Sequence, residues 1–483
     1  VSFWFHFLKD EIHSDAFQHP ELTETLLAGE TKYIDEADPD YVKIMTDGFF
    51  PYENETVLGL KSAADFAKIK PLPDDSPWFT RQIEYAKKIV GRNDGRAYFY
   101  NVFCAATTVK FMRGDDGETF LADAVKENPD AVKKGLDIKL NGEAEKVVQP
   151  AGRITSCALK PTDFRAMTPK LAVKVGDEVK AGDVLFIDKT HPEIKFTTPV
   201  SGTIEAINRG ERRKLLEVVV KADAEIRYRD FGKTEVSKLN RDEVIDRLLE
   251  SGVWPLIKQR PYDIIADPMS TPKAVFVSAF DSAPLAPDYD LILNNQSKDL
   301  QTGIDCLCKL CNKNVNLGLQ ENTPSASVFT KLQHVDINYF AGPHPAGNVG
   351  VQIHHLNPIN KGEQVWVVNI QDVAIIGRLF NEGRFDARKI IALAGSEVTK
   401  PQYYHSILGA SIQDLTAGKL KNAVEQRIIS GNVLTGTRVI PEGHLGYYDN
   451  QITVIPEGNN YEFLGWAAPG FNKFSASRLF PSF

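Results

Sequence analysis

The chain has 483 residues, a net charge of −8, 42% hydrophobic residues and 25% charged residues, a composition typical of a globular protein with several domains. The acidic balance argues against nucleic acid as the main partner, because phosphate binding needs a basic surface. No run approaches the roughly eighteen consecutive apolar residues that a transmembrane helix requires. Any work at a membrane is therefore expected to be that of a peripheral protein.

Residues 1–132 alternate between apolar runs and helical stretches. This alternation predicts parallel strands joined by helices. We expect the strands at residues 1–7, 41–45 and 96–103. The polar residues His6, Asp47 and Asn101 lie at strand ends, where barrel enzymes carry their chemistry.

Two short stretches of this segment resemble sequences of the uroporphyrinogen decarboxylase family, including its corrinoid methyltransferase branch. They are Val-Lys-Ile-Met-Thr-Asp-Gly at 42–48 and Tyr-Asn-Val-Phe-Cys-Ala-Ala-Thr-Thr-Val-Lys at 100–110. The resemblance implies a partial (β/α) barrel fragment, since family members have eight such units. The alternative function is therefore an enzyme, or a fragment of one, acting on a tetrapyrrole or a methylated cofactor.

Residues 173–186 alternate around two Gly-Asp turns, and residues 198–207 form a matching second half. This pattern is typical of biotinyl and lipoyl carrier domains. A carrier holds its modified lysine at the hairpin tip, but the midpoint here is Pro192, with Lys189 and Lys195 beside it. We therefore predict a barrel-sandwich hybrid domain with a structural role.

A helix is predicted over residues 240–252, with Asn240 and Glu243 spaced as a capping box. The turn that follows, residues 251–254, contains a single glycine and then bulky residues, so it is a poor cradle for a phosphate. The strand at 274–280 ends in a polar and proline-rich segment, where open α/β sheets present a ligand crevice. Asp281 and Pro284 are the crevice candidates.

Three cysteines, Cys306, Cys308 and Cys311, fall on one predicted amphipathic helix. Closely spaced thiols can hold zinc or an iron-sulfur cluster, but Cys306 and Cys308 point to different helix faces and no fourth cysteine lies nearby. We predict small buried residues and no metal site. Their actual role stays open at this point.

Residues 341–359 contain three glycines, three prolines and three histidines. Proline removes a backbone donor and glycine costs backbone entropy, so we expect a shaped loop and neither a helix nor a central strand. Such a loop brings the backbone close to a ligand or partner, although a rigid turn between buried strands has the same composition.

Residues 341–359 have the sequence Ala-Gly-Pro-His-Pro-Ala-Gly-Asn-Val-Gly-Val-Gln-Ile-His-His-Leu-Asn-Pro-Ile. Together with residues 366–379, this sequence resembles the A subunit of the sodium-translocating NADH:quinone reductase. The resemblance runs from about residue 133 to the end. It implies a multidomain α/β and α+β protein. The expected parts are a partial barrel fragment (1–132), a barrel-sandwich hybrid (133–236), a Rossmann-like domain related to the complex I flavoprotein subunit (237–384) and a β-grasp domain (385–483).

The same resemblance implies the function. We expect an accessory, quinone-interacting subunit of a complex that oxidises NADH, reduces ubiquinone and exports sodium. Such a subunit has no complete catalytic site and binds no cofactor tightly, since NADH, FMN and the iron-sulfur centre belong to other subunits. Its partners are the membrane subunits, and its place is the cytoplasmic face of the bacterial inner membrane.

A quinone headgroup is flat and carries two carbonyl acceptors, so its site needs an apolar slot with donors at the ends. In residues 341–359, His344 and His354 offer donors, and Gly347 and Gly350 permit close approach. Trp366 is a candidate for a flat wall. We expect His354 and His355 to alternate along a strand, so that only one of them faces a given pocket.

Overall fold

The computed structural model describes residues 138–421 and 424–459, and short pieces of the first hundred residues (24–25, 27–29, 31–32, 41–44, 84, 87–88 and 97–100). The early pieces belong to one compact unit and residues 138–459 to another. In the first unit, β1 (Tyr41–Ile44) and β2 (Ala97–Tyr100) pair in parallel, which confirms the predicted pairing of these two strands. The expected strand at 1–7 and the candidates His6, Asp47 and Asn101 lie outside the described residues.

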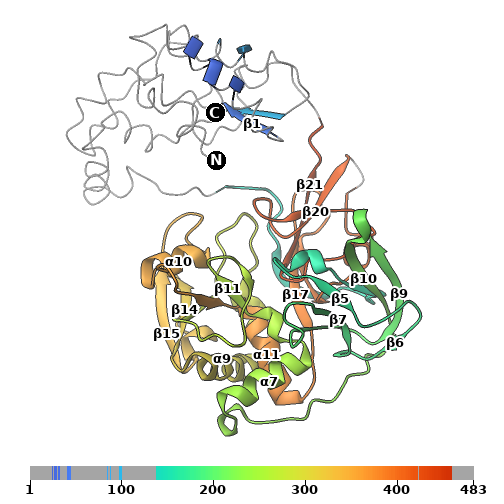
Figure 1. Ribbon diagram of the computed structural model, residues 1–483, viewed down its shortest axis with the longest axis vertical. Coiled ribbons are helices and arrows are strands. Elements are labelled where there is room, and N and C mark those ends of the chain that lie inside the picture. The colour runs from blue at the N-terminus through green and yellow to red at the C-terminus, as the bar shows by residue number, and fades with distance from the viewer. Residues whose placement is uncertain are drawn as a thin grey trace, which may run out of the picture. The chain divides into compact units, whose positions relative to one another are not determined.

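The first domain of the second unit contains two small antiparallel sheets (Figure 1). One has the order β4 (Ser156–Leu159), β10 (Leu215–Ala222), β9 (Gly202–Arg209) and β6 (Glu178–Val179). The other has the order β5 (Pro169–Leu171), β7 (Val184–Asp188) and β8 (Lys195–Thr197).

The two predicted Gly-Asp turns shape these sheets. Asp177 accepts a hydrogen bond from the backbone N–H of Lys174 at 2.9 Å, and Asp183 accepts one from Lys180 at 2.7 Å. Each aspartate thus closes its turn through its own side chain. The predicted barrel-sandwich hybrid is confirmed in its strands and its turns.

A mixed six-stranded sheet follows. Its order is β12 (Ile264–Ile265), β11 (Lys258–Arg260), β16 (Val365–Val367), β13 (Val275–Ser278), β14 (Val315–Gln320) and β15 (Val335–Phe340). The last four are parallel, while β11 runs antiparallel to both of its neighbours, β16 and β12. Its helices are α7 (Arg241–Ser251), α8 (Tyr289–Leu293), α9 (Ser297–Cys311), α10 (Val349–Leu356) and α11 (Ile370–Glu382).

Both faces of this sheet are covered. Successive side chains of β13 point to opposite faces, so their packing partners report what covers each face. Val275 and Val277 belong to the main core with α9 and α11, whereas Phe276 packs with Ile353 of α10. Figure 1 shows α10 and α9 on opposite sides of β14 and β15. The open α/β arrangement leaves the carboxyl ends of the parallel strands free to hold a site.

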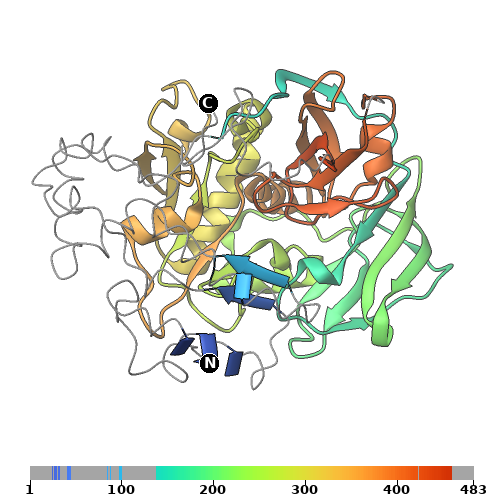
Figure 2. The same cartoon turned by 90° about the horizontal axis from the view of Figure 1, so that it is seen from above.

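A third sheet completes the unit. Its order is β20 (Thr437–Val439), β19 (Gln426–Ser430), β21 (Gln451–Pro456), β17 (Arg388–Ala394), β18 (Gln402–Ile407) and β3 (Glu145–Pro150), with α12 (Ile412–Thr416) in the connection after β18. The strand β3 was not predicted, and it joins this sheet from far upstream in the sequence. One apolar core runs through all three domains of the unit. Figure 2 shows strands β17 to β21 of the third sheet, in orange and red, beside the helices of the second domain.

The predicted helix at 240–252 is confirmed as α7. Asn240 caps it, and Glu243 returns the hydrogen bond of the capping box. The helix ends at Gly252, which has a left-handed φ of 73°. The helix predicted around the three cysteines is likewise confirmed as α9.

The prediction that residues 341–359 exclude a helix is wrong, because α10 occupies Val349–Leu356. The prolines flank this stretch at Pro345 and Pro358, and its interior contains only one glycine, so nothing within it blocks helical hydrogen bonds. The expectation that His354 and His355 alternate on a strand is wrong for the same reason. They are neighbours in the last turn of α10, and both are exposed.

Candidate functional site

A pocket of about 500 Å³ lies at the carboxyl end of β13. The N-terminal ends of α10 and α11 also border it; Asn369 caps α11 through the N–H of Gln371, whereas α10 has no side-chain cap. This is the edge at which open α/β sheets bind ligands. Its volume lies within the range of small-molecule sites.

Two serine hydroxyls, one at the end of β13 and one in the loop after it, hold the loop at 341–348 over the crevice. The hydroxyl of Ser282 accepts a hydrogen bond from the backbone N–H of Gly347 at 2.8 Å and lies 3.1 Å from Nδ1 of His344. Ser278 donates to the carbonyl of Gly347 at 3.2 Å. A side chain at Gly347 would begin 2.4 Å from the backbone nitrogen of Ser282, so only glycine fits. The predicted loop and the predicted crevice therefore form one site.

Five of the seven sequence candidates lie at the pocket or next to it. Gly347, Gly350 and Asp281 line the pocket. His344 supports the loop through Ser282, and Pro284 is buried behind the crevice, where its carbonyl accepts a hydrogen bond from Gln451.

The other two candidates lie away from the pocket. His354 is exposed on α10 and is not among the pocket residues. Trp366 is completely buried in the core, edge-on to Trp254 with ring centroids 5.5 Å apart. Neither side chain can contact a ligand in this pocket.

Several pocket residues were missed by the sequence analysis. Lys258 and Arg260 come from β11, Asp372 comes from the first turn of α11, and Tyr448 comes from the third domain. The Asn-Ile-Gln-Asp stretch at 369–372 is a recognisable helix start and could have drawn attention to Asp372. No local pattern could have placed Tyr448, because its position depends on contacts between domains.

The cations at the rim share one carboxylate. Asp263 lies 2.9 Å from the ammonium of Lys258 and 3.3 Å from the guanidinium of Arg260. The Lys258 ammonium also lies 4.6 Å from the centre of the Tyr448 ring, which is a cation–π contact. Asp263 therefore neutralises only one of these two positive charges.

Two aspartates contribute the acidic groups of the pocket. Burial raises the pKa of Asp281, whose carboxylate accepts a hydrogen bond from the backbone of Ala283. Burial also raises the pKa of Asp372, although the ammonium of Lys389, 2.8 Å away, opposes this effect. Both side chains of the Asp372–Lys389 pair are almost entirely buried.

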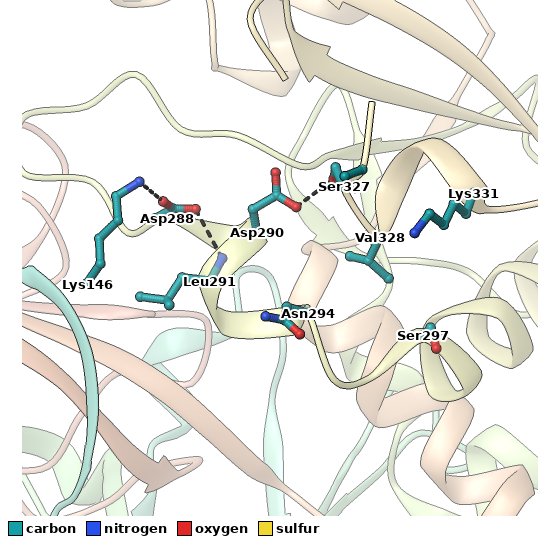
Figure 3. Close-up of a pocket in the computed structure, with 10 residues that line it drawn as sticks. Lys146, Asp288, Asp290, Leu291, Asn294, Ser297, Ser327, Val328 and Lys331 are labelled. Carbon is teal, nitrogen blue, oxygen red and sulfur yellow. Dashed lines mark hydrogen bonds and ion pairs between the residues drawn. The ribbon is translucent and has the colours of Figure 1, made fainter. Parts of the chain in front are cut away.

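A second pocket, of about 600 Å³, is lined by α8 and its flanks, residues 326–331 and Lys146 of β3 (Figure 3). Lys146 forms an ion pair with Asp288 at 2.6 Å, and Asp290 accepts a hydrogen bond from Ser327 at 2.6 Å. Its carboxylates are thus already engaged by the protein. It contains none of the buried polar atoms that lack a partner in the described residues, so the first pocket is the stronger candidate.

The three cysteines of α9 are used locally. Cys306 is in the core, while Cys308 and Cys311 donate to the backbone carbonyls of His334 and Lys313, each at 3.2 Å. Burial raises the pKa of Cys308 to about 12, which disfavours the thiolate that a metal needs. Within the described part of the chain, no group of three potential ligands is placed to hold a metal ion.

Comparison with protein families gives three matches in chain order. Residues 131–223 match the NqrA N-terminal barrel-sandwich hybrid domain, residues 239–385 the NqrA second alpha/beta domain, and residues 390–440 the NQRA C-terminal domain. Each match falls on one of the three sheet regions described above.

Curated relatives cover most of the chain. The A subunit of the Na(+)-translocating NADH-quinone reductase of Pasteurella multocida (strain Pm70) is 38% identical over 352 residues, which is 72% of this chain and 78% of that protein. The protein of the same description from Yersinia pestis bv. Antiqua (strain Angola) is 41% identical over 350 residues, with the same coverage.

Among solved structures, an NAD+-reducing [NiFe]-hydrogenase in the air-oxidized state matches with a TM-score of 0.33 and 14% identity, over 46% of this chain and 50% of that chain. That similarity is too low to support a conclusion. Among the described helices, none is both long enough and apolar enough to cross a membrane.

Proposed function

Because the chain belongs to the family of A subunits of the Na+-translocating NADH-quinone reductases, we propose that it is the accessory, quinone-interacting subunit of such a complex. In this proposal it is peripheral at the cytoplasmic face of the membrane and docks on membrane subunits. The complex couples NADH oxidation and ubiquinone reduction to sodium export. NADH, FMN and the iron-sulfur centre are held by other subunits.

We propose that the quinone headgroup enters the pocket at the end of β13. The observation that carries this proposal is the joining of the loop at 341–348 to the crevice at Asp281, which creates a slot of suitable size. Apolar groups from the loop after β13, from β16, from α10 and from the third domain form its walls, and they include Phe280, Val351 and Tyr448. A flat ring is well matched to such a slot.

The donors that a quinone needs are also available. The first backbone N–H groups of α10 have no intrahelical partner, and the side chain of Asn348 does not cap them. The ammonium of Lys258 stands at the rim over the Tyr448 ring. In this proposal Gly347, Gly350 and Asp281 contact the ligand and His344 positions the loop. His354 and Trp366 are left out because of their positions.

The proposal is tested by filling the pocket. Gly350 is a helical residue that lines the pocket, and a Cβ added there meets no atom within 4 Å, so Gly350→Leu should keep the fold and add bulk at the slot. Binding of a short-chain ubiquinone to the isolated chain should weaken roughly tenfold or more, a loss of about 1.4 kcal/mol. Lys258→Met should weaken it as well.

His354→Ala is the control, because this exposed residue lies on the same helix outside the pocket. It should bind the quinone as tightly as the parent. If Gly350→Leu and Lys258→Met both bind with the parent affinity while folded, the quinone does not use this pocket.

We also propose finer assignments of the domains. The second domain is Rossmann-like, since its parallel strands β13 to β16 are covered by helices on both faces. The third is a β-grasp domain, because β17 pairs antiparallel with β18 and parallel with β21, and α12 lies in the connection between β18 and β21. Residues 1–132 are proposed as the uroporphyrinogen decarboxylase-like fragment, a proposal that the parallel β1–β2 pair supports.

A further inference from the structure

Asp372 is an unusual group to find at the wall of a ligand pocket. It lies in the first turn of α11, is completely buried, and lines the pocket. The ammonium of Lys389 lies 2.8 Å from its Oδ1 and forms an ion pair with it, whereas Oδ2 has no hydrogen-bond partner among the described residues. The charges of Lys258 and Arg378 also favour the ionised form of this carboxyl. A buried acceptor without a donor is costly, so the pocket favours a ligand that supplies one.

The chemistry of the acceptor limits what that ligand can be. An ionised carboxylate can only accept hydrogen bonds, and a quinone carries only acceptor oxygens. The lone pairs of a quinone oxygen and of the Asp372 carboxylate would oppose each other. A quinol carries two hydroxyl donors, so one of them can bind Asp372.

The same pocket also offers hydrogen-bond donors. Lys258, Arg260 and the first N–H groups of α10 are donors. The second oxygen of a quinol can still accept a hydrogen bond from them, because a hydroxyl group both donates and accepts. The pocket therefore offers both an acceptor, at Asp372, and donors, at Lys258, Arg260 and the start of α10.

We propose that Asp372 makes this site selective for the reduced ring, so that the chain binds quinol in preference to quinone. The inference rests on the proposed function, because it assigns the preferred redox form of the ligand in that same pocket. Lys389 has a positioning role, since its ammonium favours the ionised carboxylate. A charge-assisted hydrogen bond is about twice as strong as a neutral one, which explains the size of the preference.

The test compares the affinities of the full chain for a short-chain ubiquinol and the matching ubiquinone, measured anaerobically near pH 8. We expect the quinol to bind roughly ten- to a hundredfold more tightly, the usual worth of a hydrogen bond to a charged group. Asp372→Asn presents an amide donor as well as an acceptor, so the preference should fall to about threefold or less, or reverse.

Asp290→Asn is the matched control, because it makes the same chemical change at the other pocket. It should keep the full preference for quinol. Asp372→Asn leaves the buried Lys389 without its partner and can fail to fold. The double variant Asp372→Leu with Lys389→Met removes both charges, and it should bind the two redox forms equally.

Failure of this inference can be told apart from failure of the proposed function. Equal affinity of the parent chain for quinol and quinone, with both lost in Gly350→Leu, would overturn the selectivity and leave the quinone pocket standing. Full quinol preference in a folded Asp372→Asn variant would also overturn it. Binding of neither form to the parent chain would overturn both proposals.

Discussion

Gly252→Ala should destabilise the chain strongly, although the substitution adds one methyl group. Gly252 has a φ of 73°, and a left-handed conformation costs an alanine about 1–2 kcal/mol. The added carbon would also lie 2.2 Å from the hydroxyl oxygen of Thr197 in β8. Relief of such an overlap in a packed interior costs about 1–3 kcal/mol. Together these terms predict a loss of roughly 2–5 kcal/mol in the free energy of unfolding.

The matched control is Gly418→Ala. Gly418 has nearly the same φ, 68°, but a side chain there meets nothing within 4 Å. It should therefore lose only the conformational part, about 1–2 kcal/mol. Guanidinium unfolding of both variants, analysed with the parent m-value, measures the difference. Equal destabilisation would refute the reasoning, because it would mean that the turn after α7 is not packed on β8.

Three further outcomes are expected. Limited proteolysis should yield a resistant core that begins near Lys133, and recovery of an intact unit spanning residues 1–129 would contradict this. The purified chain should be colourless and bind neither FMN nor NADH tightly, because the single-glycine turn at Gly252 is closed by Thr197; a flavin band that survives gel filtration would show otherwise. The interaction with His444, 3.4 Å away, lowers the pKa of Glu217 below 4.5, so its stabilising contribution is lost as the pH falls through that lower pKa. Between about pH 6 and 3, the free energy of unfolding of Glu217→Gln, measured with urea, should fall less than that of the parent. An identical fall in the two proteins would refute this.

Features that depend on neighbouring residues could be predicted from the sequence. The capping box of α7 joins Asn240 to Glu243 within one turn, and both hydrogen bonds form as expected. The Gly-Asp turns of the first domain are equally local, since Asp177 and Asp183 bond to backbone only three residues away. Such interactions survive in almost any tertiary setting, which is why the pattern sufficed.

The candidate site was only half predictable. The loop and the crevice were each visible as departures from regular structure, and Gly347, Gly350 and Asp281 do line the pocket. Composition over residues 341–359 concealed α10, because the average over the segment hid an eight-residue stretch without proline. Asp372 and Tyr448 reach the pocket through the packing of α11 and of the third domain, which no periodicity reports.

The strand β3 is synthesised long before the strand with which it pairs. Its neighbour in the sheet is β18, with which it pairs in parallel. That partner is made roughly 250 residues later, so at about 5–20 residues per second β3 waits on the order of 10 to 50 s after translation before it can pair. During that time its backbone donors and acceptors are open to another nascent chain. Faster translation of the intervening domain, or a chaperone that covers residues 145–150, should therefore raise the yield of folded protein without changing the stability of the finished fold.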